Sequence, residues 1–377
     1  MNISFNKPHF TGNEIKYIED AVKSMHISGD GKFTKKCHEF LENRYGFAKV
    51  LLTTSCTDAL EMAAILIDIQ PGDEVILPSF TFVSTANAFV LRGAKLVFVD
   101  SLSQHPNMDV STIEPLITSK TRAIVPVHYA GSACNMDGIM ELAGKHSLYV
   151  IEDAAQAIDS FYKDRPLGSF GHLAAFSFHE TKNIISGEGG MLVVNDNRFL
   201  KRAEIIREKG TNRSQFYRGE VDKYGWMDIG SSYLPSDMIA AFLFAQLENL
   251  DVIQKKRKYI WNNYAKLLQP LVDNGHVKFL DIPDFATNNG HLFALISKSL
   301  EERTSLLNYM RLQGVFPVFH YLSLHNSPFY EAKHDGRQLP NCDRFADTLL
   351  RLPFYYDLSD QDIERVASLI IDFYNGK

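Results

Sequence analysis

Short apolar runs alternate with longer amphipathic stretches along the first two thirds of the chain. Four of the runs have the length of buried strands: 74–77, 95–99, 123–127 and 148–151. A stretch between two of them, 58–68, places its apolar residues on one face at helical spacing. This alternation predicts a mainly parallel sheet with helices on both faces, and therefore an α/β fold.

The residues that follow these runs are small or polar. They are Pro78-Ser79, Asp100, His128-Tyr129 and Glu152-Asp153. In open α/β sheets, ligands bind beyond the carboxyl ends of the strands. We therefore expect the functional site at the edge of the sheet where these residues meet.

Two further apolar runs, 174–178 and 191–194, flank a glycine-rich segment at 186–190. This segment predicts a turn between two strands. It has neither the spacing nor the following helix of a dinucleotide-binding loop, so we assign it no such role.

The last third of the chain has a different pattern, which predicts a smaller α+β domain. A helical pattern from 236 to about 268 leads into it, followed by an apolar run, a helix, a strand and a C-terminal helix at 291–296, 300–313, 315–319 and from Asp360. We predict a large domain at 1–249, with its N-terminal segment, and a small domain at 250–377.

Composition narrows the class of protein. The chain has 377 residues, of which 45% are hydrophobic, and its net charge is −6. Without a tract rich in Lys and Arg, a nucleic-acid partner is not expected. Apolar runs such as 238–247 are too short to span a bilayer, and the first residues lack the pattern of a signal peptide. We expect a cytoplasmic protein with four reduced thiols, at Cys37, Cys56, Cys134 and Cys342.

Lys182 is the strongest candidate for chemistry. It lies 29 positions after Asp153 and five after Ser177. A lysine amine can form an imine with the aldehyde of pyridoxal phosphate (PLP), and a carboxylate can keep the pyridine nitrogen protonated. A hydroxyl such as that of Ser177 can bind the phosphate. These three residues in this order therefore predict a PLP site, although Asp153 alone would also suit a structural role as a helix cap.

The segment 53–60 carries small hydroxyl residues into the start of a predicted helix. Free backbone amides and the helix dipole at that start could hold a phosphate near Ser55, Cys56 and Thr57. The simpler alternative is an N-cap, since Ser, Thr and Asp all cap helices well. The presence of Lys182 and Asp153 favours the phosphate interpretation.

Three other features are compatible with ligand contact. Phe82 follows a strand end, where an aromatic ring could stack on a cofactor or simply fill the core. His320 and His325 are five positions apart without a third ligand, so substrate contact or loop packing is favoured over a metal. The segment 210–226 mixes Arg213 and Arg218 with aromatics. It suits either a diphosphate and a base or a solvated surface loop.

Together these motifs resemble the DegT/DnrJ/EryC1/StrS family of PLP-dependent sugar aminotransferases over nearly the whole chain. Within it, the sequence is most similar to members that make dTDP-4-amino-4,6-dideoxygalactose for the enterobacterial common antigen. The most similar stretches are 71–75, 81–94, 125–131 and the loop 207–234. The resemblance implies the aspartate-aminotransferase fold (fold type I), with a mixed, mostly parallel sheet. It also implies a homodimer with the site at the interface.

Carried over by position, the resemblance implies Lys182 as the Schiff-base lysine and Asp153 as the partner of the pyridine nitrogen. It implies that Ser232 reaches the phosphate from the neighbouring subunit, although many relatives have Asn there and Arg at the position of Leu234. The other implied contacts surround the cofactor and the substrate. They are Ser55, Cys56, Thr57 and Ser177 for the phosphate, Phe82, Ala155 and Gln156 for the ring, and Arg213, Arg218, Tyr224, His320 and Tyr321 for the substrate.

The implied reaction converts dTDP-4-keto-6-deoxy-D-glucose to dTDP-4-amino-4,6-dideoxy-D-galactose, with L-glutamate as amino donor. The gluco epimer and other nucleotide keto-sugars remain alternatives. A sugar dehydratase of the same fold would replace the lysine with histidine, and Lys182 argues against it. A PLP-fold regulator would add a DNA-binding domain or lose site residues, and neither is seen in the sequence.

Overall fold

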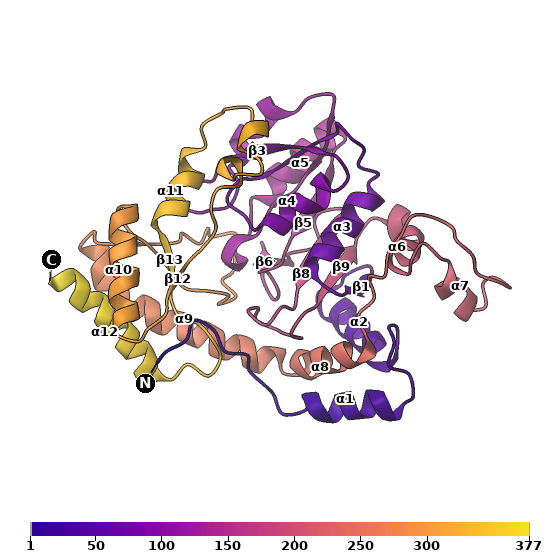
Figure 1. Cartoon of the computed structure of the whole chain (residues 1–377), viewed down its shortest axis with the longest axis horizontal. Helices are drawn as coiled ribbons and strands as arrows, with labels where there is room; N and C mark the ends of the chain where they lie inside the picture. The colour runs from indigo at the N-terminus through magenta and orange to yellow at the C-terminus, as the bar shows by residue number, and fades with distance from the viewer. Residues whose placement is uncertain (1, 377) are drawn as a thin grey trace.

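A seven-stranded sheet forms the centre of the protein (Figure 1). The computed structural model describes residues 2–376. The strand order is β1-β9-β8-β5-β4-β2-β3, and β9 alone runs antiparallel to its neighbours. The mixed, mostly parallel sheet of the predicted α/β fold is thereby confirmed. In chain order the strands are β1 (Val50–Thr53), β2 (Glu74–Pro78), β3 (Lys95–Val99), β4 (Thr121–Ile124), β5 (Tyr149–Asp153), β8 (Leu173–Ser177) and β9 (Gly190–Val194).

Two hydrophobic cores lie on the two faces of this sheet. Residues alternate between them along each strand, so that Val75 and Leu77 face one core and Ile76 faces the other. Strands buried on both faces explain the continuous apolar runs in the sequence. The first core contains α3 (Cys56–Leu66), α4 (Val83–Val90) and α6 (Leu200–Arg207), and the second contains α2 (Lys32–Tyr45), α5 (Met136–His146) and α8 (Asp237–Glu248).

A second, smaller sheet has the antiparallel order β10-β11-β13-β12. A third hydrophobic core lies between this sheet and the helices α9, α10 and α12. Ile3, near the start of the chain, belongs to the same core. The chain start therefore packs on its C-terminal part, as Figure 1 shows. The strands are β10 (Lys278–Phe279), β11 (Ala294–Ile296), β12 (Val318–Phe319) and β13 (Leu349–Arg351), and the helices are α9 (Leu250–Asp273), α10 (Leu300–Leu312) and α12 (Asp360–Asn375).

The structure corrects several predicted elements. The helix expected from 236 to 268 is two helices, because Asn249 leaves the helical conformation between α8 and α9. The strands expected at 123–127 and 315–319 are shorter, and Pro126 and Pro317 explain this because proline has no N–H for a ladder. The remaining α-helices and strands are α1 (Glu14–Lys23), a hairpin of β6 (Phe161–Tyr162) and β7 (Arg165–Pro166), α7 (Arg213–Tyr217) and α11 (Pro340–Thr348). None of the described helices has the length and apolarity to cross a bilayer.

The first turn of α3 lies directly against β9. A Cβ atom at Gly190 would overlap the backbone nitrogen of Cys56 and the carbonyl carbon of Ser55. Gly190 also pairs with Thr53 on β1 and Ser177 on β8. Only glycine allows this close approach, which places the helix start beside the ends of three strands.

We predict that Gly190→Ala lowers the free energy of unfolding by about 1–3 kcal/mol, because the helix start must move away from the sheet. Urea unfolding followed by circular dichroism measures it. Gly144→Ala on α5 is the matched control, since a Cβ there meets nothing within 4 Å. A Gly190→Ala variant as stable as the wild type would contradict the close approach.

Candidate active site

A cavity of about 730 Å³ opens beyond the carboxyl ends of the central strands, where the sequence predicted the site. This volume is typical of pockets that hold a cofactor and a small substrate. All but one of the predicted cofactor residues line it, Ser232 being the exception: Ser55, Cys56, Thr57, Phe82, Asp153, Ala155, Gln156, Ser177 and Lys182.

Lys182 lies in the connection between β8 and β9. Its backbone N–H donates to the carbonyl of His179 at 2.9 Å, within a tight turn. Burial lowers the pKa of the Lys182 amine, and the Arg351 charge lowers it further, while Asp153 opposes the shift. The amine therefore spends more time in the neutral form that reacts as a nucleophile or a base.

Asp153 ends β5 and is 6% exposed. One carboxylate oxygen accepts a hydrogen bond from the Thr85 hydroxyl at 2.6 Å, and the other accepts from the Ala155 N–H at 3.1 Å. Among residues 2–376, no basic side chain lies within 4.0 Å of it as an ion-pair partner. A buried carboxylate of this kind suits a cationic partner such as a protonated ring nitrogen. The sequence pattern did not indicate Thr85, which lies on α4 and also bonds the Thr81 hydroxyl at 2.9 Å.

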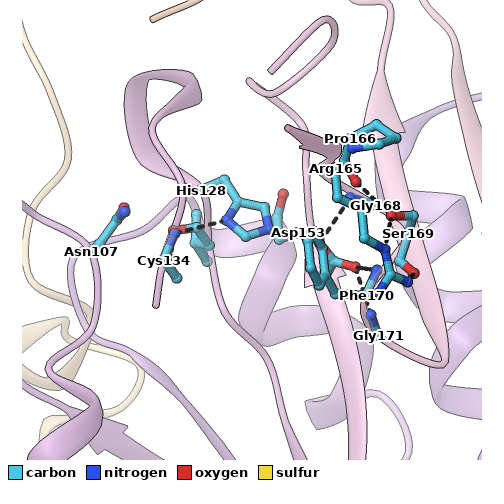
Figure 2. A network of polar contacts seen from close by, with 12 residues as sticks. Asn107, His128, Cys134, Asp153, Arg165, Pro166, Gly168, Ser169, Phe170 and Gly171 are labelled. Carbon is cyan, nitrogen blue, oxygen red and sulfur yellow. Dashed lines mark hydrogen bonds and ion pairs between the residues drawn. The ribbon is translucent and has the colours of Figure 1, made fainter. Parts of the chain in front are cut away.

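The neighbouring Glu152 points away from Asp153, since successive strand residues face opposite sides. Its carboxylate accepts from the backbone N–H groups of Gly168, Phe170 and Gly171 at 2.7–2.8 Å. It also contacts His128 Nε2 at 3.0 Å. Nδ1 of that ring accepts from the N–H of Cys134, as Figure 2 shows. These contacts fix the end of β5, and therefore the direction of the Asp153 side chain.

The start of α3 provides an anion cradle. Ser55 is the N-cap residue, and its hydroxyl accepts from the N–H of Asp58 at 3.0 Å. The capping interpretation is therefore correct for Ser55. Cys56 and Thr57, in the first turn, line the cavity together with Ser177, and the N–H groups of a first helical turn have no partner within the helix. Together with the glycine at position 190, which keeps this space free of a side chain, the cradle fits a phosphate group.

The residues predicted to contact the cofactor ring also line the cavity. Phe82 is 55% exposed, so its ring belongs to the cavity wall and not to the core. Gln156 accepts from the Ala130 N–H at 2.7 Å and donates to the Tyr321 hydroxyl at 3.2 Å. Tyr321 has φ of +51°, a conformation that bulky residues rarely adopt and that is common at functional sites.

His320 and His325 point to different places. His320 Nδ1 bonds the Tyr129 hydroxyl at 2.7 Å and lines the cavity with Tyr321. His325 Nδ1 bonds the Ser79 hydroxyl at 2.7 Å and does not line it. The two rings therefore serve separate contacts and do not share a metal.

The predicted nucleotide anchors lie outside this cavity. Arg213, Arg218 and Tyr224 belong to α7 and the loop after it, which projects from the body of the protein (Figure 1). Arg218 pairs with Glu220 at 2.6 Å and Glu204 at 2.9 Å of its own chain. Within one chain, therefore, the structure does not bring these residues to Lys182.

Two more cavity residues had no signal in the sequence analysis. Arg351 ends β13 of the small sheet, and His291 lies just before β11. His291 Nδ1 bonds the side-chain oxygen of Asn183, next to Lys182, at 2.8 Å. Both residues come from the predicted small domain, so a local motif near Lys182 could not have indicated them.

Comparison with known proteins places this geometry in a family. The DegT/DnrJ/EryC1/StrS aminotransferase family matches residues 8–371. The chain is 33% identical to GDP-perosamine synthase of Escherichia coli O157:H7, over 98% of both chains.

Solved structures agree with this match. The aminotransferase TlmJ from Streptoalloteichus hindustanus has a TM-score of 0.92 and 26% identity, over 100% of both chains. Spr1654 from Streptococcus pneumoniae, solved in its PLP form, has a TM-score of 0.91 and 25% identity, over 100% of this chain and 99% of that one. The chain belongs to the DegT/DnrJ/EryC1/StrS aminotransferase family and is a PLP-dependent sugar aminotransferase.

Proposed function

We propose that this enzyme transfers the amino group of L-glutamate to C4 of dTDP-4-keto-6-deoxy-D-glucose and forms dTDP-4-amino-4,6-dideoxy-D-galactose. The observation that carries the transamination is the buried Lys182 amine in one cavity with the Asp153 carboxylate. The sequence of the loop 207–234 supports the dTDP-sugar and the galacto product. This loop resembles that of the family members that make the galacto product, which suggests that the sugar binds in the same pose. The pose decides which face of C4 receives the proton.

Five of the cavity residues have roles toward the cofactor in this proposal. PLP, when bound, supplies an aldehyde and an electron-withdrawing ring. The amides of Cys56 and Thr57 and the Ser177 hydroxyl hold its phosphate, and Asp153 pairs with its ring nitrogen. The Lys182 amine would hold the aldehyde carbon. Once a donor amine takes that place, the Lys182 amine would move a proton between the donor α-carbon and the cofactor C4′.

A homodimer completes the site in this proposal. The loop that contains Arg213, Arg218 and Tyr224 projects from its own chain, and Trp226 on it is 85% exposed. Exposed aromatics of this kind are typical of interfaces. We propose that this loop and Ser232 reach the cavity of the partner subunit. There the nucleotide diphosphate would replace Glu208, which lies 3.4 Å from Arg213, and the two carboxylates that pair with Arg218.

A second candidate substrate is a GDP-linked keto-sugar. The similarity to GDP-perosamine synthase, over nearly all of both chains, supports it. In this proposal the nucleotide binds to the projecting loop, whereas the keto group reacts near Lys182. The preference for the nucleotide base can therefore be tested separately from the amination of the sugar.

We predict that Lys182→Ala loses at least about 10³-fold in turnover, because both the covalent attachment and the proton transfer are lost. In the wild type, borohydride reduction followed by peptide mass spectrometry should find the pyridoxyl group on Lys182. Lys163, an exposed lysine, is the internal control and should stay unmodified. A pyridoxyl group on another lysine would refute the assignment.

A mixed dimer tests the contribution of the partner subunit. We predict that Arg213→Ala/Arg218→Ala has little activity with the nucleotide sugar, and that Lys182→Ala has none. A heterodimer of the two, purified through two different tags, should regain about half of the wild-type activity, since one of its two sites is then intact. If the loop acts on its own chain, both sites stay defective, and the absence of recovery would contradict the proposal.

Product NMR tests the substrate and the stereochemistry. We expect amination of dTDP-4-keto-6-deoxyglucose with L-glutamate, and a product whose H4 shows only small couplings to H3 and H5, because H4 is equatorial in a galacto sugar. Large diaxial couplings would establish the gluco epimer instead. The GDP-linked keto-sugar, assayed in parallel, should react far more slowly. A preference for it would overturn the dTDP assignment and leave the transamination intact.

A further inference from the structure

His291 presents one ring nitrogen to the cavity that holds Lys182. The residue lies just before β11, is 7% exposed and lines the cavity. Nδ1 bonds the side-chain oxygen of Asn183 at 2.8 Å. Nε2 has no hydrogen-bond partner among residues 2–376 and is not sealed inside the protein, so it faces the cavity. Whether this nitrogen donates or accepts there depends on the tautomer of the ring.

Neighbouring amides fix this tautomer. The side-chain NH2 group of Asn183 donates to the Gln254 side-chain oxygen at 2.9 Å and to the Asn289 carbonyl at 3.0 Å. A backbone carbonyl can only accept, so the group that meets His291 must be the Asn183 oxygen, and it receives a hydrogen from Nδ1. Burial holds the pKa of His291 well below its ordinary value, so the ring has no second hydrogen. Nε2 is therefore an acceptor.

The other histidines that line the cavity do not present a fixed acceptor of this kind. His128 has a partner on each nitrogen. His179 Nδ1 bonds a threonine hydroxyl two positions further along its own loop at 2.9 Å. His320 bonds the Tyr129 hydroxyl, which can donate or accept, so neither of its nitrogens is fixed as an acceptor. Within residues 2–376, a fixed neutral acceptor on an imidazole is thus particular to His291 in this cavity.

The charges around His291 indicate that it lies close to the Lys182 amine. The charge of Lys182 lowers the pKa of His291 more than the charges of Arg257 and Arg351 do, although Arg257 donates to the His291 carbonyl at 2.7 Å. Asn183, which holds the ring, is also the residue that follows Lys182. The Lys182 amine makes no hydrogen bond with any of residues 2–376, so its N–H groups are available to Nε2.

We propose that His291 is a positioning residue for Lys182, and that its Nε2 accepts a hydrogen bond from the Lys182 amine whenever that amine is not bonded to the cofactor. The inference rests on the proposed proton transfer by Lys182. A freed lysine has a flexible four-carbon stem, and an acceptor on a rigid ring restricts it without adding a charge. Cys56 and Asp153 also face the amine. Neither replaces Nε2, because a thiol is a weak acceptor and Asp153 is held by Thr85.

Two substitutions separate the acceptor from the contact with Asn183. His291→Asn keeps an NH2 group where Nδ1 lies and removes the nitrogen that faces the cavity. His291→Gln can place its side-chain oxygen where Nε2 lies, and it gives up the contact with Asn183. Urea unfolding establishes that both variants are folded, and His291→Leu, which also lacks the acceptor, takes the place of His291→Asn if that variant is unstable.

The pKa of the Lys182 amine is the first readout. In the pyridoxamine phosphate form the amine is free, and His291→Asn should lower its pKa by about 1, because a hydrogen bond to the charged form is lost. His291→Gln should keep most of the wild-type value. Trace labelling with acetic anhydride over a pH series, followed by peptide mass spectrometry, measures it without any substrate. Lys163, which is exposed and pairs with Asp137, is the internal control and should not change.

The donor half-reaction is the second readout. In His291→Asn, kcat with L-glutamate should fall by about 10-fold, because the amine is no longer oriented, while KM stays within about threefold. The kinetic isotope effect with a donor deuterated at the α-carbon should increase, since proton transfer then limits the rate.

Three outcomes would overturn the inference: an unchanged Lys182 pKa in His291→Asn, a loss confined to the KM of the nucleotide sugar, or greater damage in His291→Gln than in His291→Asn. The last of these is the order that a purely structural role through Asn183 predicts. A pyridoxyl group on a lysine other than Lys182 would overturn the proposed function as well, whereas the labelling result decides the role of His291 alone.

Discussion

The geometry of the site depends on the hydrogen bonds of the buried Glu152 carboxylate. It accepts from three backbone amides of the segment 168–171 and contacts His128, so it joins the end of β5 to two other chain segments. Each amide left without a partner in this buried position would cost about 1–3 kcal/mol. Because strand residues alternate in direction, fixing Glu152 on one face also fixes Asp153 on the other. The direction of the cofactor-facing carboxylate is thus set from behind the strand.

Much of the central sheet was predictable because its strands are buried on both faces. Their apolar runs are short and uninterrupted, and Pro126 explains why β4 ends at Ile124, before the expected end at 127. The spacing of Phe33, Cys37 and Leu41 follows the buried face of α2, so this helix had an available signal that the prediction did not use. The break at Asn249 had none, because the apolar spacing continues through it.

Asp153 and Lys182 were predictable because each lies at or shortly after the end of an apolar strand, β5 for Asp153 and β8 for Lys182. Thr85 and Arg351 reach the cavity from α4 and from the small sheet. Their contacts join segments far apart in the sequence, and the local pattern around each is that of an ordinary helix or strand. The proposed contact of Arg213 and Arg218 with the cavity would join two subunits, and the sequence pattern of one chain carries no signal of such a contact. The division into domains at 249 and 250 likewise stays a prediction.

The antiparallel strand β9 has a consequence for the timescale of motion at the site. Because β8 and β9 form a hairpin, the connection that holds Lys182 is closed by the Ser177–Gly190 pair and by backbone bonds from Phe178 to Gly189 and from Ser186 to Phe178. A crossover helix would have left the lysine on a segment able to fray separately from the sheet. Here local opening of the lysine segment requires loss of sheet hydrogen bonds, so its amides should exchange with solvent as slowly as those of the core strands. The backbone of Lys182 can thus remain still while its side chain exchanges partners in every catalytic cycle.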